Sequence, residues 1–133
     1  MPGSVERFVT AETWGATPAT VAAARSLLDR SLERAAVEPA RRLDALLVAS
    51  ELVTNAVRHG SRPGDQISVE FQLEGSRLTI RVRDAAHART IPVALTPDQH
   101  RVGGRGLAIV DRLAEWSEQI VHGRREVSAE LTL

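Results

Sequence analysis

The segment from Pro39 to Gly60 constrains the fold more than any other part of the chain. Proline is favoured in the first turn of a helix, and glycine commonly ends one by adopting a left-handed backbone conformation, so the segment is predicted to be a helix. One side of this helix carries a broad stripe of apolar side chains. Such a stripe needs a surface to pack against, and we expect the helix to dock on a sheet. The residues of the stripe are Leu43, Leu46, Ala49, Leu52, Val53, Ala56 and Val57.

The other side of the same helix is polar. Because a helix turns by about 100° per residue, Glu51 and Asn55 project from the same side, together with Asp44 and Arg58. Two interpretations are open for this side of the helix. It is either an ordinary solvated surface or the lining of a site that uses a carboxylate and an amide one turn apart.

Two strands and further helices complete the predicted layers. Residues 67–73 and 78–82 alternate apolar and polar side chains, and Gly75-Ser76 predicts a tight hairpin turn between them. A short edge strand is expected at residues 5–10, a helix from Thr17-Pro18 to about Ala36, a helix over 107–116, and a closing hairpin formed by 119–122 and 127–133. The sequence thus predicts a single domain over residues 1–133, an α/β (α+β) sandwich of two layers with about three helices on one face of the sheet.

Composition excludes several classes of function. Seventeen basic and seventeen acidic residues give a formal net charge of zero, which does not indicate binding to nucleic acid or to an anionic membrane. Every basic residue is arginine, so a phosphate-binding loop of the Walker type, which needs lysine, is excluded. The absence of cysteine excludes thiolate chemistry and disulfides, and no apolar run approaches the roughly 20 residues that span a bilayer. We expect a cytoplasmic protein.

Two further features stand outside the regular pattern. Asp84 has the same parity as Leu78, Ile80 and Val82, which directs its carboxylate toward the buried layer unless the strand has ended and Asp84 only caps the following turn. After a stretch without periodicity at 85–102, the run 103–106 (Gly-Gly-Arg-Gly) directly precedes a predicted helix. Glycines in that position allow backbone amides to approach an anion, although flexible turns use glycine as well.

The order of these features resembles a known family. The segment Glu51-Leu52-Val53-Thr54-Asn55-Ala56-Val57-Arg58-His59-Gly60 is similar to the N box of the GHKL superfamily of ATP-binding domains (gyrase, histidine kinase and mismatch repair), whose architecture is the Bergerat fold. The similarity is greatest to its anti-sigma-factor, serine-kinase-like branch of actinobacterial regulators, and it covers nearly the whole chain. It implies a mixed, mostly antiparallel sheet.

The resemblance also implies roles for individual residues. Asn55 would coordinate a magnesium ion that bridges the phosphates of ATP, and Glu51 would be the catalytic residue that orients or deprotonates the attacking hydroxyl. Asp84 would accept a hydrogen bond from the adenine amino group. The second glycine box would hold phosphate through backbone amides, with an added cationic contact from arginine; it comprises Gly103, Gly104, Arg105, Gly106 and Leu107.

The first glycine box departs from the family pattern. Where the family has Asp-x-Gly-x-Gly, this chain has Asp84-Ala85-Ala86-His87-Ala88, with alanine at both glycine positions. The added methyl groups oppose positive backbone torsions and intrude where the backbone approaches the base. His87 and the other three histidines show no metal-ligand spacing.

Two functions therefore remain open, and with them whether the chain is an enzyme. The first is an anti-sigma-factor-like regulator that binds ATP and Mg²⁺, dimerises, binds a sigma factor or an antagonist protein, and acts as a protein-serine kinase on that antagonist. The second is a protein-binding module that retains the fold with weak or no ATP binding, as the altered first glycine box indicates. A histidine-kinase ATPase module cut from its phosphoacceptor domain is a weaker third interpretation, because no dimerisation helix with a phosphoacceptor histidine is recognisable here.

Overall fold

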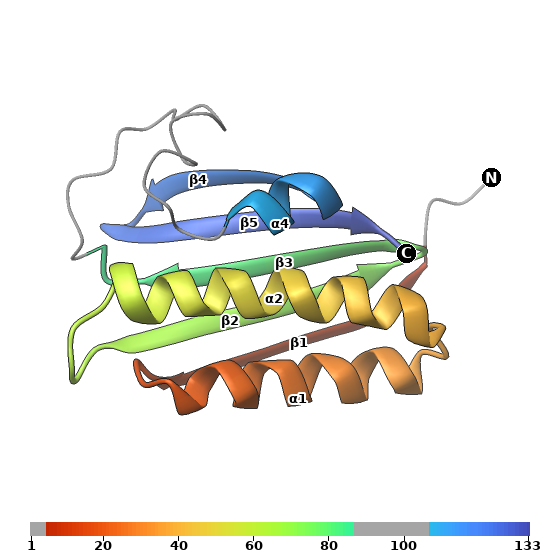
Figure 1. Ribbon diagram of the computed structural model, residues 1–133, viewed down its shortest axis with the longest axis horizontal. Helices are drawn as coiled ribbons and strands as arrows, with labels where there is room; N and C mark the ends of the chain where they lie inside the picture. The colour runs from red at the N-terminus through yellow and green to blue at the C-terminus, as the bar shows by residue number, and fades with distance from the viewer. Residues whose placement is uncertain (1–4, 87–106) are drawn as a thin grey trace.

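A computed structural model describes residues 5–86 and 107–133 of the chain. These residues form two layers, with an antiparallel sheet as one layer and the helices as the other (Figure 1). The predicted fold class is confirmed, and every strand pair in the described residues is antiparallel.

The sheet has five strands in the order β1-β2-β3-β5-β4. They are β1 (Glu6–Gly15), β2 (Gln66–Glu74), β3 (Arg77–Asp84), β4 (Glu115–Val121) and β5 (Arg124–Thr132). The predicted edge position of the first strand is confirmed, although the strand extends to Gly15. The predicted hairpin turn also forms, with Gly75 at a φ of 58° between β2 and β3.

The helices are α1 (Ala19–Arg34), α2 (Pro39–His59) and α4 (Leu107–Leu113). All three lie on the same face of the sheet, with α2 in the middle, α1 on its β1 side and α4 on its β4 side (Figure 1). In the part of the chain that the structure describes, no helix combines the length and apolar character that crossing a membrane requires.

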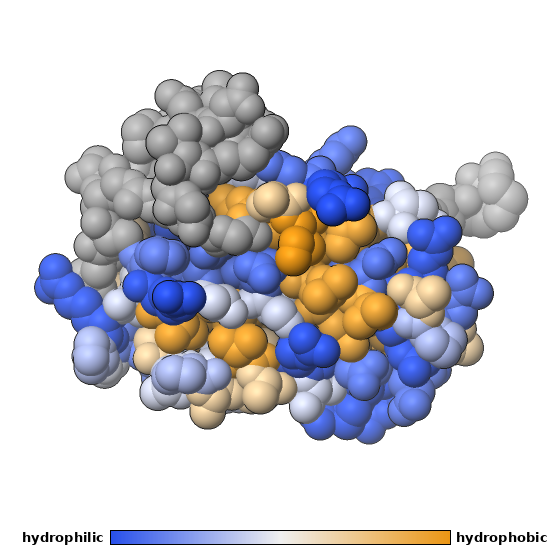
Figure 2. Space-filling model, in the orientation of Figure 1, coloured by the Kyte–Doolittle hydropathy of each residue, from blue (hydrophilic) through white to orange (hydrophobic). Residues whose placement is uncertain are grey.

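The core lies between these layers. Alternate residues of β2 and β3, such as Phe71 and Ile80, are fully buried against apolar residues of α1 and α2, such as Leu28 and Val53. This is the burial that the period-2 and helical patterns predicted. Seen from outside, the helix-bearing face still carries apolar side chains over α2 and α4, interspersed with charged ones (Figure 2).

Two details of the predicted α2 are wrong. Leu43 is 53% exposed and is not part of the buried stripe, because at about 100° per residue it points away from the side of α2 that carries Ala45, Ala49 and Leu52. Gly60 does end the helix, but with φ at −107° it does not adopt the left-handed conformation that we expected.

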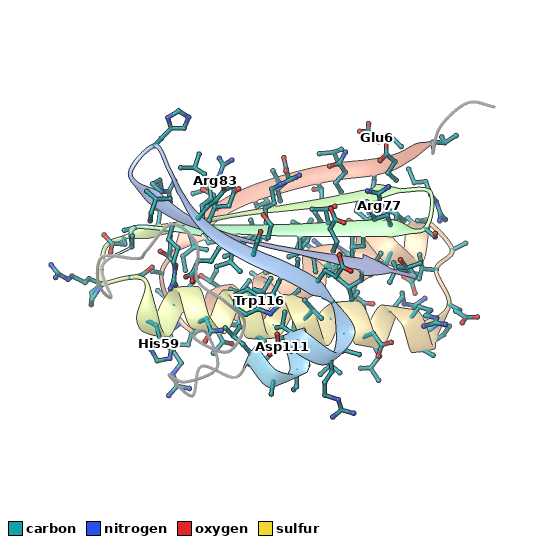
Figure 3. All side chains as sticks on the ribbon, turned by 90° about the horizontal axis from the view of Figure 1, so that it is seen from above. Glu6, His59, Arg77, Arg83, Asp111 and Trp116 are labelled. Carbon is teal, nitrogen blue, oxygen red and sulfur yellow. The ribbon has the colours of Figure 1, made fainter. Side chains whose placement is uncertain are left out.

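The third predicted helix is too long. It ends at Leu113, and Glu115 and Trp116 instead pair with Glu130 and Ala129 of β5. Trp116 Nε1 donates a hydrogen bond of 2.6 Å to Asp111 Oδ1, which holds the start of β4 against α4 (Figure 3). Aromatic residues suit strands as well as buried helix faces, so the pattern alone did not separate the two.

Candidate functional site

The centre of the candidate site is the second half of α2. Asn55 is 7% exposed, and Glu51, one turn earlier, is partly buried. The solvated-face interpretation is therefore wrong for Asn55. Its amide lies in a small cavity bounded by α2, α4, β4 and β5.

Burial affects the chemistry of Glu51. Desolvation disfavours the charged carboxylate and raises the pKa of Glu51 above its ordinary value. A carboxylate with a raised pKa is a better proton acceptor than an ordinary surface glutamate, so this position suits a general base.

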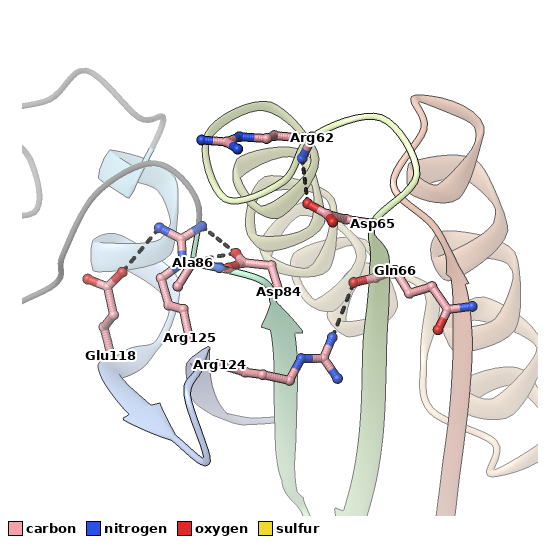
Figure 4. Close-up of polar contacts among 8 residues, drawn as sticks. All are labelled: Arg62, Asp65, Gln66, Asp84, Ala86, Glu118, Arg124 and Arg125. Carbon is pink, nitrogen blue, oxygen red and sulfur yellow. Dashed lines mark hydrogen bonds and ion pairs between the residues drawn. The ribbon is translucent and has the colours of Figure 1, made fainter.

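Asp84 lies at the end of β3 and points into the buried layer, as its parity predicted. It is 1% exposed. Its carboxylate has a partner that the sequence reading missed: Oδ2 accepts hydrogen bonds from Arg125 Nε at 2.9 Å and from Arg125 Nη2 at 2.5 Å (Figure 4). Burial raises the pKa of Asp84, against the opposing influence of the Arg125 charge and hydrogen bonds.

Arg125 is itself enclosed. It is 2% exposed and is the largest of the fully buried side chains among the described residues. On its other side, Nη1 donates to Glu118 Oε1 at 3.3 Å, so the guanidinium lies between two carboxylates (Figure 4). We call Asp84, Arg125 and Glu118 the buried charge cluster. Three strands supply it, because Asp84 and Arg125 are cross-strand partners of β3 and β5 while Glu118 comes from β4.

Gly60 allows the end of α2 to contact the buried charge cluster. A Cβ placed at Gly60 would overlap the carboxylate of Asp84 and the guanidinium of Arg125. Glycine is therefore required here for a close approach and not for an unusual torsion. The end of α2 and the end of β3 are in direct contact only because this residue has no side chain.

The chain after Asp84 turns sharply. Asp84 Oδ1 accepts a hydrogen bond of 2.8 Å from the amide of Ala86, and Ala86 adopts a φ of 61°. Ala86 stands at the first position where the sequence has alanine in place of glycine. The backbone thus retains the glycine-like conformation at that position despite the methyl group.

A comparison with protein families decides what these features belong to. The sequence profile of the histidine kinase-like ATPase domain matches residues 15–129. The chain belongs to this family. No curated protein matches the chain.

Membership of the histidine kinase-like ATPase family supports an ATP-binding regulatory protein, with Mg²⁺ as the usual companion of ATP. Of the residues predicted to hold such a ligand, the structure brings Asn55 and Leu107 to one cavity, which Arg125 also lines, and Asp84 contacts Arg125 directly. Gly103, Gly104, Arg105 and Gly106, as well as His87 and Ala88, lie outside the described residues, so the phosphate-binding role of the second glycine box stays a prediction.

The described residues include groups that suit the phosphates and the magnesium ion of a nucleotide. Toward Asn55 and Glu51, amide and carboxylate oxygens are the kind of ligand that Mg²⁺ and phosphate chemistry use. No group of three or more metal-ligating side chains occurs in 5–86 or 107–133, so a magnesium ion here would depend on oxygens of the ligand itself. The cavity that Asn55 lines together with Arg125 measures about 10 Å³, which is room for at most one water molecule.

Arg125 and Glu118 are the site residues that sequence reasoning missed. A signal was present, because Arg125 has the same parity along its strand as the apolar residues Val127, Ala129 and Leu131. Arginine at the start of a hairpin strand is normally solvated, however, and nothing in the sequence pairs it with Asp84, which lies 41 residues earlier.

Proposed function

We propose that this chain is an anti-sigma-factor-like regulatory protein of the cytoplasm, in which an ATP-binding domain controls the capture of a protein partner. The observation that carries the proposal is the placement of Glu51 and Asn55 one turn apart on α2, with Asn55 buried beside α4 and the pKa of Glu51 raised by burial. Membership of the histidine kinase-like ATPase family supports the ATP-binding part of it.

In this proposal, one residue of α2 binds the ligand and another takes part in the chemistry. Asn55 would hold Mg²⁺ and the phosphates through its side-chain oxygen. Glu51 would orient a serine hydroxyl of the antagonist protein and accept its proton, which a partly desolvated carboxylate does readily. Bound magnesium-ATP would supply the phosphoryl group.

Titration of the folded chain with magnesium-ATP, followed by calorimetry and thermal shift, tests the binding step. We expect Asn55→Ala to lose the magnesium-dependent part of the affinity and Glu51→Ala to keep binding while phosphotransfer to a serine-containing antagonist slows. Asp44→Ala, on the same side of α2 but earlier in the helix, is the matched control and should change neither. Equal loss of binding in the Asn55 and Glu51 variants would contradict the division of roles.

For the partner, we propose a sigma factor, a small antagonist protein, or both, bound by a homodimer of this chain, without direct contact to nucleic acid. The balanced charge supports a protein partner over nucleic acid. Pull-down of a panel of sigma factors and their antagonists, with sedimentation analysis of the free chain, tests this. A monomer that retains none of the panel would overturn it.

A second candidate is favoured by the buried charge cluster. Because Asp84 is already paired with Arg125, the chain can serve as a protein-binding module that keeps the fold with weak or no ATP binding. The absence of a binding signal at about 1 mM magnesium-ATP, which means an affinity weaker than about −4 kcal/mol, together with retained partner binding would select this candidate over the kinase.

A further inference from the structure

The edge strand β1 has one side that is open to a further strand. It pairs with β2, and in the part of the chain that the structure describes no strand lies on its other side. β1 is the longest of the described strands, contains no proline, and pairs without a register shift from Phe8 to Gly15. Long and regular edge strands of this kind readily pair with another chain.

Helix α1 lies beside this edge, and a groove runs between the two elements (Figure 1). The groove has a volume of about 450 Å³. Trp14 and Leu27, both partly buried, form its apolar part, and the exposed side chains of Glu12 and Arg30 form its charged part. An exposed sheet edge with pockets for alternate side chains is the arrangement by which domains bind an extended peptide as an added strand.

Two contacts fix the order of the residues along the groove. At one end, Thr20 Oγ1 donates a hydrogen bond to the carbonyl of Gly15, and at the other end Arg7 donates to the carbonyl of Ala35. The helix therefore runs antiparallel to β1. Arg30, in the second half of α1, consequently lies toward the end of the groove that Arg7 marks.

The two charges in the groove are opposite in sign and separate. Within the described residues, neither Glu12 nor Arg30 forms an ion pair with the other or with any further side chain. An inward-pointing charge on an edge strand opposes pairing with a chain that offers no counter-charge. A peptide with a basic side chain opposite Glu12 and an acidic one beside Arg30 meets both charges favourably, whereas the reverse order places like charges together.

Antiparallel addition sets the spacing of the side chains that such a peptide needs. Every strand pair in the described sheet is antiparallel, and residues directly opposite each other project to the same face. From its N-terminus, an added strand presents every second side chain opposite Trp14, Glu12 and Thr10 in that order. The Trp14 position suits an apolar side chain and the Glu12 position a basic one. The Thr10 position, at the end of the groove where Arg30 lies, suits an acidic one.

We propose that the groove between β1 and α1 binds an extended segment of a partner protein, which adds to β1 as an antiparallel strand. The segment carries an apolar, a basic and an acidic residue at alternate positions, in that order from its N-terminus. Main-chain hydrogen bonds to β1 supply affinity, and the three side chains supply specificity. The groove lies on the α1 side of α2, whereas the cavity of Asn55 lies on the α4 side, so this binding goes beyond the proposed function and requires no nucleotide.

Calorimetric titration of the full chain with two synthetic peptides, without nucleotide, tests the inference. The matched peptide is acetyl-Thr-Ile-Thr-Lys-Thr-Glu-Thr-amide, and in the swapped peptide the lysine and the glutamate exchange places. The wild-type chain should bind the matched peptide at least about tenfold more tightly, because both charges of the swapped peptide meet like charges. In the double variant Glu12→Lys/Arg30→Glu this preference should reverse.

The matched control is the double variant Glu33→Lys/Arg34→Glu. It makes the same two charge changes at exposed positions of α1 that do not line the groove, and it should keep the wild-type preference. Amide NMR shifts on addition of the matched peptide should concentrate in β1 and α1.

Each outcome of these titrations supports or overturns the inference. Preference for the matched peptide that reverses in Glu12→Lys/Arg30→Glu would support it. Equal affinity for the two peptides, no binding at about 1 mM peptide, or amide shifts in β4 in place of β1 would overturn it. A dimer in sedimentation analysis that Glu12→Lys dissociates would identify a second copy of the chain as the occupant and would also overturn it. If the double variant does not fold, the comparison of the two peptides on the wild type decides, and a failure to bind magnesium-ATP would affect the proposed function alone.

Discussion

Gly60 and Asp84 approach so closely that a Cβ on the glycine would overlap the aspartate carboxylate. Gly60 ends α2 and Asp84 ends β3, so this contact fixes the distance between the helix that carries Glu51 and Asn55 and the strand end that carries the buried charge cluster. The first prediction concerns this contact.

Gly60→Ala should destabilise the fold by about 1–3 kcal/mol, the range found for overpacking a closely packed interior. The added methyl group must push away either a buried carboxylate or the guanidinium that is paired with it. Urea unfolding measures the effect. Gly15→Ala is the control, because a Cβ at Gly15 meets no atom within 4 Å, and equal stability of the two variants would show that the close approach is unimportant.

Replacement of Ala86 by glycine should stabilise the fold, whereas Gly60→Ala should destabilise it. At a φ of 61° an alanine costs about 1–2 kcal/mol relative to ordinary torsions, whereas glycine does not have this cost. Because glycine also makes the unfolded chain more flexible, Ala86→Gly should give a net gain of about 0.5–1 kcal/mol in the free energy of unfolding.

The adjacent residue provides the comparison for this variant. Ala85 is not among the described residues with positive φ, so Ala85→Gly should lower stability by up to about 1 kcal/mol through the flexibility of the unfolded chain alone. Ala36, at a φ of 60° in the turn after α1, should respond like Ala86. A loss of stability in both Ala36→Gly and Ala86→Gly would contradict the argument from torsion.

These residues show how much of the fold and site the sequence could predict. The two-layer class, α2 and the inward direction of Asp84 follow from periods of 3.6 and 2, because burial of one face is a local property of a segment. The partner of Asp84 could not be predicted, since cross-strand register joins residues that are distant in the chain, and Arg125 alone looks like a solvated arginine. The boundary between α4 and β4 was misplaced for a similar reason, because pairing with β5 outweighs the helical pattern from Glu115 onward.

Glu51→Gln should separate function from stability. Since the pKa of Glu51 is higher in the folded protein than in the unfolded chain, the folded protein binds the proton more tightly than the unfolded chain does. Ionisation of Glu51 at neutral pH therefore opposes folding. The neutral amide should therefore raise the melting temperature slightly at pH 7, and the difference from wild type should vanish as the pH falls below about 4, where Glu51 is protonated in both states. The same variant should slow the proposed phosphotransfer, because the amide cannot accept the serine proton. A lower melting temperature at pH 7 would indicate that Glu51 has a structural role.

Glu126, on the outer face of the sheet, predicts a pH dependence of the opposite kind. Burial alone would raise its pKa, but hydrogen bonds from Arg83 at 2.6 Å and Gln119 at 3.1 Å, with the charges of Arg83 and Arg81, outweigh burial and lower it. A depressed pKa means that the ionised form stabilises the fold. That contribution is complete above the unfolded-state pKa of about 4.3 and is lost as the pH falls through the lower folded-state pKa.

Glu126→Gln should therefore be less stable than wild type at pH 7, and the two melting temperatures should converge as the pH is lowered from about 4.5 toward 3. Glu130 is an exposed residue of the same strand and provides the control Glu130→Gln. The free energy of unfolding of this variant at pH 7 should lie within a few tenths of a kcal/mol of the wild-type value. A gap between wild type and Glu126→Gln that stays constant with pH would show that the ion pair with Arg83 does not stabilise the sheet.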